Sequence, residues 1–203
     1  MAVSIIASSL SGILAWILGY KTYIKEKKIW RLLLYICIGA AAGAVFHVYG
    51  WLPSKVVRYL ILIYGMLLIA HIDYKNHIIP NQLLLCLLGI RFVLLIIELI
   101  SYSNAVIELL SSAFGGMFIG FFIFLIAYYI SKKGIGMGDV KLIAVIGFYT
   151  GASVLYGIMI ISLLCCVVYS VVQLIRRKLT TKDFVAFGPF VAIGTVLALF
   201  LGI

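Results

Sequence analysis

Acidic residues are scarce in this chain, which makes each of them informative about chemistry. Only 6 of the 203 residues are Asp or Glu. Asp73 and Asp139 stand apart because one lies where a long apolar run ends and the other where an apolar run begins. Ionisable groups at the margin of a membrane span are costly and are usually functional. We therefore predict that this pair carries the chemistry, the alternative being that each acid only caps its own helix.

The other four acids have simpler interpretations. Glu26 and Asp183 lie beside lysines and read as solvated counter-charges. Glu98 and Glu108 flank the short polar segment 101–104. We expect both of them to reach water there, in a structural or solvating role.

The residues next to the two aspartates predict how the backbone turns. Pro80 lacks a backbone N–H and disfavours helix in the residue before it, so a new helix should begin near Pro80 and Asn81. Gly136 and Gly138 directly precede Asp139. Because these glycines have no side chain, another backbone can approach the acid closely.

Three further residues near these motifs are expected to be structural. Lys141 lies two positions after Asp139, about 200° around a helix, so we expect it to extend to lipid headgroups instead of contacting the acid. Gly188 and Pro189 are expected to form a kink in the last apolar run that shapes packing.

The elements that must hold these residues are membrane helices. The chain is 66% hydrophobic and 11% charged, with a mean hydropathy of +1.26, whereas soluble domains are about half apolar and about a quarter charged. Long apolar runs without an alternating pattern indicate helices, because a helix satisfies its own backbone groups in lipid. We predict an all-α, polytopic membrane helix bundle forming a single domain over residues 1–203. The eight expected segments are 3–20, 29–52, 54–72, 81–100, 105–130, 139–150, 152–175 and 185–203.

Loop charges predict the orientation of these segments. Basic residues are enriched in cytoplasmic loops, which places both aspartates at the cytoplasmic margin of the cell membrane and both termini outside. The sixth segment is too short to cross, since twelve residues reach about 18 Å against a hydrocarbon core of about 30 Å. It must be shielded by its neighbours or stop partway. The basic residues assigned to the cytoplasmic side are Lys21, Lys25, Lys27, Lys28, Arg31, Lys75, Lys132, Lys133, Arg176, Arg177, Lys178 and Lys182, against Lys55 and Arg58 on the other side.

Several other functions are not indicated. The net charge of +10 does not predict nucleic-acid binding, because the basic residues occur in short stretches between apolar runs. The cysteines Cys37, Cys86, Cys165 and Cys166 lie inside apolar runs without metal-ligand spacing, so neither a disulfide framework nor a metal site is expected. The glycine-rich segment 131–138 lacks the Gly-Lys-Ser/Thr ending of a phosphate loop. We expect no cofactor.

Three motifs, in order, resemble the type IV prepilin peptidase family of membrane aspartic proteases. Ile72 and Asp73, followed by Ile-Pro-Asn at 79–81, resemble the family's first aspartate motif. The segment 136–142, which reads Gly-Met-Gly-Asp-Val-Lys-Leu, resembles the second. Phe-Gly-Pro-Phe at 187–190 is similar to the signature of the final helix.

The resemblance implies an intramembrane aspartic endopeptidase with Asp73 and Asp139 as the catalytic pair. One ionised carboxylate takes a proton from water, while one protonated carboxyl polarises the scissile carbonyl. Asp139 begins a helix and Asp73 ends one, so the helix dipole predicts that Asp139 is the ionised base at rest. Gly136 and Gly138 are expected to let an extended substrate backbone lie against the acid, the alternative being an ordinary turn.

The resemblance also implies the substrates. Family members remove the basic leader from type IV prepilin-like precursors (pilins, pseudopilins or preflagellins), whose apolar helix lies in the bilayer, at the cytoplasmic membrane face. Many members carry a cytoplasmic insertion with paired CxxC motifs, linked to N-methylation, where this chain has a short loop without cysteine. A peptidase-only protein is therefore predicted. The competing interpretations are a proton-coupled small-solute transporter that uses the same two aspartates, and a scaffold that keeps the fold without activity.

Overall fold

A computed structural model describes residues 43, 45–50, 52–131, 134–177 and 185–202, and the regular elements in this part of the chain are all helical. The prediction of an all-α fold is confirmed for these residues. The elements are α4 (Pro53–Asn76), α5 (Asn81–Ser101), the short 3₁₀ helix η1 (Ser103–Ala105), α6 (Val106–Ile130), α7 (Met137–Thr150), α8 (Ala152–Ile175) and α9 (Gly188–Leu201).

Four helices of the described part are long and apolar enough to cross a membrane: Pro53–Asn76, Asn81–Ser101, Ser103–Ile130 and Ala152–Ile175. The helices α7 and α9 have 14 residues each, which corresponds to about 21 Å. The first predicted segment and most of the second lie outside the described residues. A total of eight spans and the side on which the termini lie therefore stay predictions.

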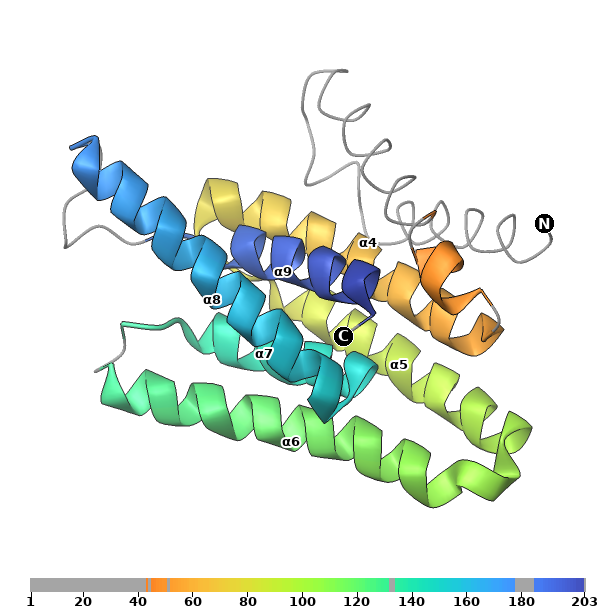
Figure 1. Cartoon of the computed structure of the whole chain (residues 1–203). Coiled ribbons are helices and arrows are strands. Elements are labelled where there is room, and N and C mark those ends of the chain that lie inside the picture. Colours follow the sequence, from red (N-terminus) through yellow and green to blue (C-terminus); the bar gives the residue numbers. More distant parts are fainter. Residues whose placement is uncertain (1–42, 44, 51, 132–133, 178–184, 203) are drawn as a thin grey trace.

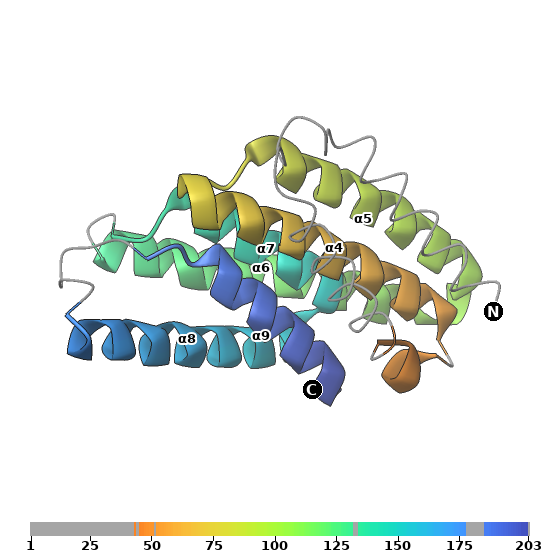
Figure 2. The same cartoon turned by 90° about the horizontal axis from the view of Figure 1, so that it is seen from above.

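The short helix α7 forms the centre of the bundle (Figures 1 and 2). It contacts α4, α5, α6 and α8, and its residues from Leu142 to Thr150 are buried. The prediction that neighbours shield this short segment is therefore confirmed. Burial among other helices also explains why its sequence is apolar on all sides.

Glycines hold α7 directly against α6. A Cβ atom at Gly116 would clash with the carbonyl of Gly147, and one at Gly147 would clash with the carbonyl of Gly116. Small residues at such positions let two helix backbones touch, which is a common way to pack helices in lipid. This contact fixes the position of α7 and therefore of the acid at its start.

The outer helices α6 and α8 present apolar side chains to their surroundings. In their most apolar windows only 22% and 17% of the residues are buried, and the exposed side chains include Phe118, Phe122, Leu164 and Val168. Patches of this extent are not left in water, and the hydrocarbon of a bilayer is the matching environment. The chain is a membrane protein.

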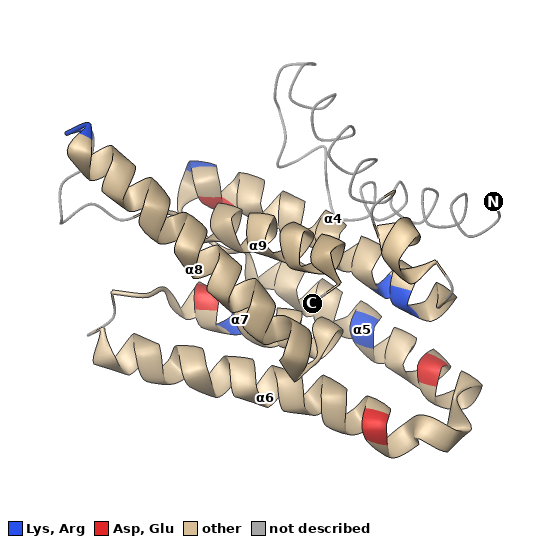
Figure 3. Cartoon of the chain, in the orientation of Figure 1, with Lys and Arg blue, Asp and Glu red and all other residues tan. Residues whose placement is uncertain are grey.

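The described charged residues lie mainly toward the two ends of the bundle (Figure 3). Lys55 and Arg58 lie in the first two turns of α4, and Asp73 and Lys75 lie in its last turn. The start of α7 and the start of α9 meet the end of α4, as the contacts below show. One end of the bundle therefore gathers residues that are far apart in the sequence.

Candidate active site

Asp73 lies in the last turn of α4, with only 5% of its surface exposed. Its Oδ2 atom accepts a hydrogen bond of 2.8 Å from the backbone N–H of Gly188, at the start of α9. The first N–H groups of a helix have no partner within the helix and carry partial positive charge. α9 thus provides a backbone donor that stabilises a negative charge on Asp73.

Gly188 has a different role from the predicted one. It begins α9, and Pro189 occupies the first turn of this helix, so the predicted kink within the last segment is wrong. Proline is well tolerated at the start of a helix because its missing N–H would be unpaired there anyway. A Cβ atom on Gly188 would lie 2.8 Å from Oδ2 of Asp73. A glycine is needed here because any side chain would push the carboxyl group away from its donor.

Asp139 occupies the first turn of α7, outside the four candidate spans. Its Oδ2 accepts a hydrogen bond of 3.2 Å from the backbone N–H of Gly136, the residue that caps this helix. Burial and, to a smaller extent, the negative charge of Asp73 raise the pKa of Asp139 to about 6, and the Gly136 hydrogen bond acts in the opposite direction. The two carboxyl groups therefore interact electrostatically.

Both carboxyl groups line one cavity of about 730 Å³. Its walls come from three separate parts of the chain: the end of α4 with the linker to α5, the segment 134–141, and the segment 185–187. The structure thus brings together two acids that are separated by 65 intervening residues in the printed sequence. A cavity of this size, lined by two carboxyl groups with interacting charges, is suited to acid–base chemistry on a bound ligand.

The direction of the Asp139 shift runs against the helix-dipole expectation. The dipole of α7 favours the ionised form, whereas burial and the neighbouring Asp73 raise the pKa of Asp139. Asp73, in turn, receives an N–H donor from α9 that the sequence did not reveal. The raised pKa of Asp139 speaks against the predicted ionised state of this acid at rest, and the Gly188 N–H can stabilise a carboxylate on Asp73.

The two glycines beside Asp139 line the same cavity. A Cβ atom on Gly138 would lie 3.0 Å from the Cβ of Ile79, so this glycine lets the second motif pack against the first. Gly136 supplies the N–H that binds Asp139. Both positions serve the structure of the protein itself, and contact with a substrate backbone stays a prediction.

A hydrogen bond joins the beginnings of α5 and α7. Nζ of Lys141 donates to Oδ1 of Asn81 at 3.0 Å, a contact that the sequence did not predict, and the extension of Lys141 to lipid headgroups stays a prediction. Pro80 immediately precedes α5, which begins at Asn81, as predicted. Since Asn81 and Lys141 both line the cavity, this bond ties together two of its walls. Among the described residues, no group of three His, Cys, Asp or Glu is placed to hold a metal ion.

Sequence reasoning also missed a second polar centre, at the other end of the bundle. Glu98, expected to reach water, is only 3% exposed and is held by Arg58 and Arg91. The signal was available, because Arg91 and Glu98 are seven residues apart and therefore lie on the same face of one helix. Two opposite charges on one face of an apolar helix indicate a buried ion pair.

The fold and the site define a helical membrane protein in which a buried and a partly buried carboxyl group share one cavity. The sequence profile of the type IV leader peptidase family matches residues 60–171, which is more than half of the chain and includes both aspartates. The chain belongs to this family.

Curated relatives agree with the family assignment. A prepilin leader peptidase/N-methyltransferase of Bacillus subtilis (strain 168) is 31% identical over 166 residues, covering 82% of this chain and 62% of the relative. Proteins of the same name from Pectobacterium carotovorum and Escherichia coli (strain K12) are 29% and 27% identical, covering 74% and 82% of this chain. The chain spans 62% of the Bacillus relative and 54% of the Pectobacterium relative. No solved structure matches the chain.

Proposed function

We propose that the chain is an aspartic endopeptidase that removes the basic leader from type IV prepilin-like precursors. The observation that carries the proposal is the placement of Asp73 and Asp139 in one cavity with interacting charges. Family membership supports it, because the relatives are named prepilin leader peptidases. A proton-coupled carrier would also need two membrane acids, but nothing in the family comparison favours one.

The proposed reaction uses the two carboxyl groups in different protonation states. The Asp73 carboxylate, held by the Gly188 N–H, accepts a proton from a water molecule, and the water oxygen adds to the scissile carbonyl carbon. Asp139 donates its proton to the carbonyl oxygen as the tetrahedral intermediate forms. The proton on Asp73 then passes to the leaving nitrogen, the C–N bond breaks, and the proton on the oxygen returns to Asp139. Such a pair titrates as a unit, which keeps one proton available for the reaction.

The proposed location of the site is the cytoplasmic face of the cell membrane. The same end of the bundle carries Lys75 at the end of α4 and Arg176 and Arg177 at the end of α8. Positive residues next to spans mark the cytoplasmic side. A precursor with an apolar helix in the bilayer and a basic leader in the cytoplasm would present its cleavage site at this depth.

The test is to co-express the chain with a pilin, a pseudopilin and a preflagellin precursor and to measure removal of the leader by mass. We expect cleavage of at least one precursor, and its loss by about 10³-fold or more in Asp73→Asn and in Asp139→Asn. Glu108→Gln, at an exposed acid that lines the cavity at the start of α4 and not the cavity of the aspartates, is the matched control and should cleave normally. Cleavage that persists in either aspartate variant contradicts the proposal, and proton-dependent solute uptake without cleavage would favour the carrier.

A further inference from the structure

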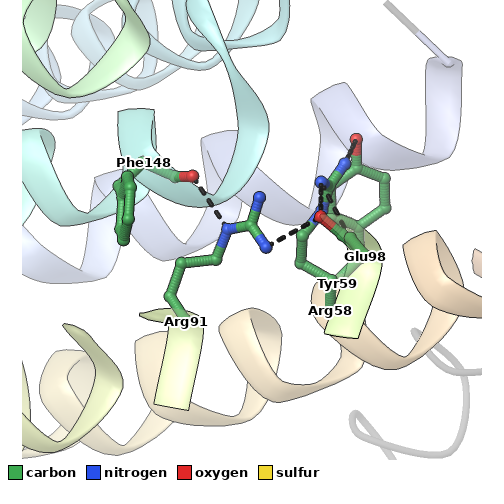
Figure 4. A network of polar contacts seen from close by, with 5 residues as sticks. All are labelled: Arg58, Tyr59, Arg91, Glu98 and Phe148. Atoms are coloured by element: carbon green, nitrogen blue, oxygen red, sulfur yellow. Dashed lines mark hydrogen bonds and ion pairs between the residues drawn. The ribbon is translucent and has the colours of Figure 1, made fainter. Parts of the chain in front are cut away.

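The second polar centre joins three helices through the hydrogen bonds of two arginines and one carboxylate (Figure 4). Nη1 of Arg58, from α4, donates to Oε1 and Oε2 of Glu98, both at 3.3 Å. Nη1 of Arg91, from α5, donates to Oε2 of Glu98 at 3.0 Å, and its Nε donates to the carbonyl oxygen of Phe148, in α7, at 3.0 Å. Arg58, Arg91 and Glu98 are exposed by only 7%, 1% and 3%.

The charges of this network do not balance. Two guanidinium groups share one carboxylate, so one positive charge is left over in a buried volume. Charges out of water are costly unless they are paired. Lys55, one turn before Arg58, adds another positive charge, and the exposed acid Glu108 lines the same cavity, so three cations face two acids there. An additional negative charge would complete this site.

One hydrogen-bond donor of the network is also unused. Nε of Arg58 is buried and has no hydrogen-bond partner among the described residues. Buried donors are almost always paired in folded proteins, so an unpaired one marks a position where an acceptor binds. The Nη atoms of the same side chain are occupied by Glu98 and by the hydroxyl of Tyr59, which holds the guanidinium plane in a fixed orientation.

There is room for a ligand beside these groups. Lys55, Arg58, Arg91 and Glu98 line a cavity of about 390 Å³. Lys55 and Arg58 belong to the first two turns of α4, where a membrane span meets the headgroup region, and Arg91 lies deeper, at the middle of α5. The cavity is at the opposite end of α4 from Asp73, so it is separate from the candidate active site.

We propose that this cavity binds a phosphate-type oxyanion, carried by the headgroup of an anionic phospholipid or free in solution. The planar guanidinium of Arg58 offers its unused Nε–H to one oxygen, and the ammonium of Lys55 provides a mobile second cation. Guanidinium groups suit phosphate because their donors match the spacing of its oxygens. Arg91 and Glu98 hold Arg58 in place and supply the excess positive charge.

The first experiment tests binding of a lipid. The full chain is placed in nanodiscs that contain both phosphatidylglycerol and phosphatidylcholine and is then purified away from them. The lipids that remain bound to the protein are counted by native mass spectrometry. We expect phosphatidylglycerol to be retained preferentially. Retention should fall roughly tenfold in Lys55→Gln and in Arg58→Lys. Arg58→Lys keeps a cation for Glu98 but lacks the Nε donor. Lys55→Gln leaves the buried network intact, so it tests the site even if Arg58→Lys does not fold. Arg176→Gln removes an exposed charge from the other end of the bundle and should retain the lipid.

The second experiment separates the two sources of the oxyanion. Inorganic phosphate is titrated into the delipidated chain, and the thermal unfolding midpoint is followed in the native protein and in Lys55→Gln. If the unfolding midpoint rises with phosphate in the native protein but not in Lys55→Gln, and no phosphatidylglycerol is retained, the ligand is a free anion. Retained phosphatidylglycerol identifies the lipid as the ligand. Equal retention of both lipids with no response to phosphate overturns the proposal, as does unchanged binding in Lys55→Gln and Arg58→Lys. Asp73→Asn should bind like the native protein, so this test is independent of the proposed peptidase activity.

Discussion

The two ends of this helix bundle hold their buried charges in opposite ways. At one end two carboxyl groups, Asp73 and Asp139, face the same cavity, and each receives a single backbone N–H in the described structure. At the other end one carboxylate, Glu98, is shared by two guanidinium groups. Like charges meet at the first centre, and opposite charges at the second.

The difference shows how charge placement separates chemistry from structure. Two like charges in a buried site raise each other's affinity for a proton, which produces a group that can donate a proton near neutral pH but costs stability. Opposite charges attract each other, and the hydrogen bonds of Arg58, Arg91 and Glu98 tie α4, α5 and α7 together even though one positive charge is left over. We therefore expect substitutions at the aspartate end to affect mainly activity, and substitutions at the arginine end to affect mainly folding.

The largest expected effects come from neutralising one acid at each end. Asp139→Asn should abolish cleavage while the protein stays as stable as the native chain or slightly more so, because a repulsion is removed. Glu98→Gln should lower the free energy of unfolding by about 3–5 kcal/mol, because two buried guanidinium groups lose their carboxylate. Leader cleavage and thermal unfolding in detergent measure both quantities. If Glu98→Gln instead removed activity from fully folded protein, the separation of roles would fail.

A smaller effect is expected from the glycine that contacts Asp73. In Gly188→Ala the new Cβ would lie 2.8 Å from Oδ2 of Asp73 and would displace the carboxyl group. Misplacement of a reacting group by about 1 Å costs about 10- to 100-fold in rate. The matched control is Gly89→Ala in α5, where a Cβ meets nothing within 4 Å. Equal cleavage rates in the two variants would show that the Gly188 contact does not position Asp73.

The pH dependence of stability should identify the coupling at the aspartate end. The pKa of Asp139 rises from 3.8 to about 6 in the folded chain. Between these values the folded state binds more protons than the unfolded state, so stability should fall as pH rises from about 4 to about 6. Asp73→Asn removes the neighbouring charge and should move this fall to lower pH. Thermal unfolding midpoints measured across this range provide the test, and an unchanged profile in Asp73→Asn would show that the two acids are not coupled.

The smallest expected effect concerns the bond between two cavity walls. Lys141→Met removes the hydrogen bond to Asn81 and should lower stability by about 1 kcal/mol. In a double-mutant cycle with Asn81→Leu, the two losses should not add, because both substitutions remove the same contact. Additive losses would mean that the bond at 3.0 Å contributes nothing to the joining of α5 and α7.

The sequence predicted much of the fold and of the candidate site because their signals are local. Apolar runs marked the described helices closely, since a helix in lipid must be apolar along its length. Proline at position 80 marked the start of α5. Asp73 and Asp139 attracted attention because acids are rare in such a chain. The role of Gly188 was predicted incorrectly and the bond of Lys141 to Asn81 was missed, since each contact depends on a partner more than 50 residues away.

The sequence by itself determined that the chain forms apolar helices, that two acids lie at their ends, and which family its motifs resemble. Only the tertiary structure decided that α9 provides a donor for Asp73, that burial and a neighbouring charge raise the pKa of Asp139, and that Glu98 is buried between two arginines. Helix formation depends on neighbouring residues, whereas the environment of a charge is set by the elements that pack around it. That environment exists only once the helices have assembled.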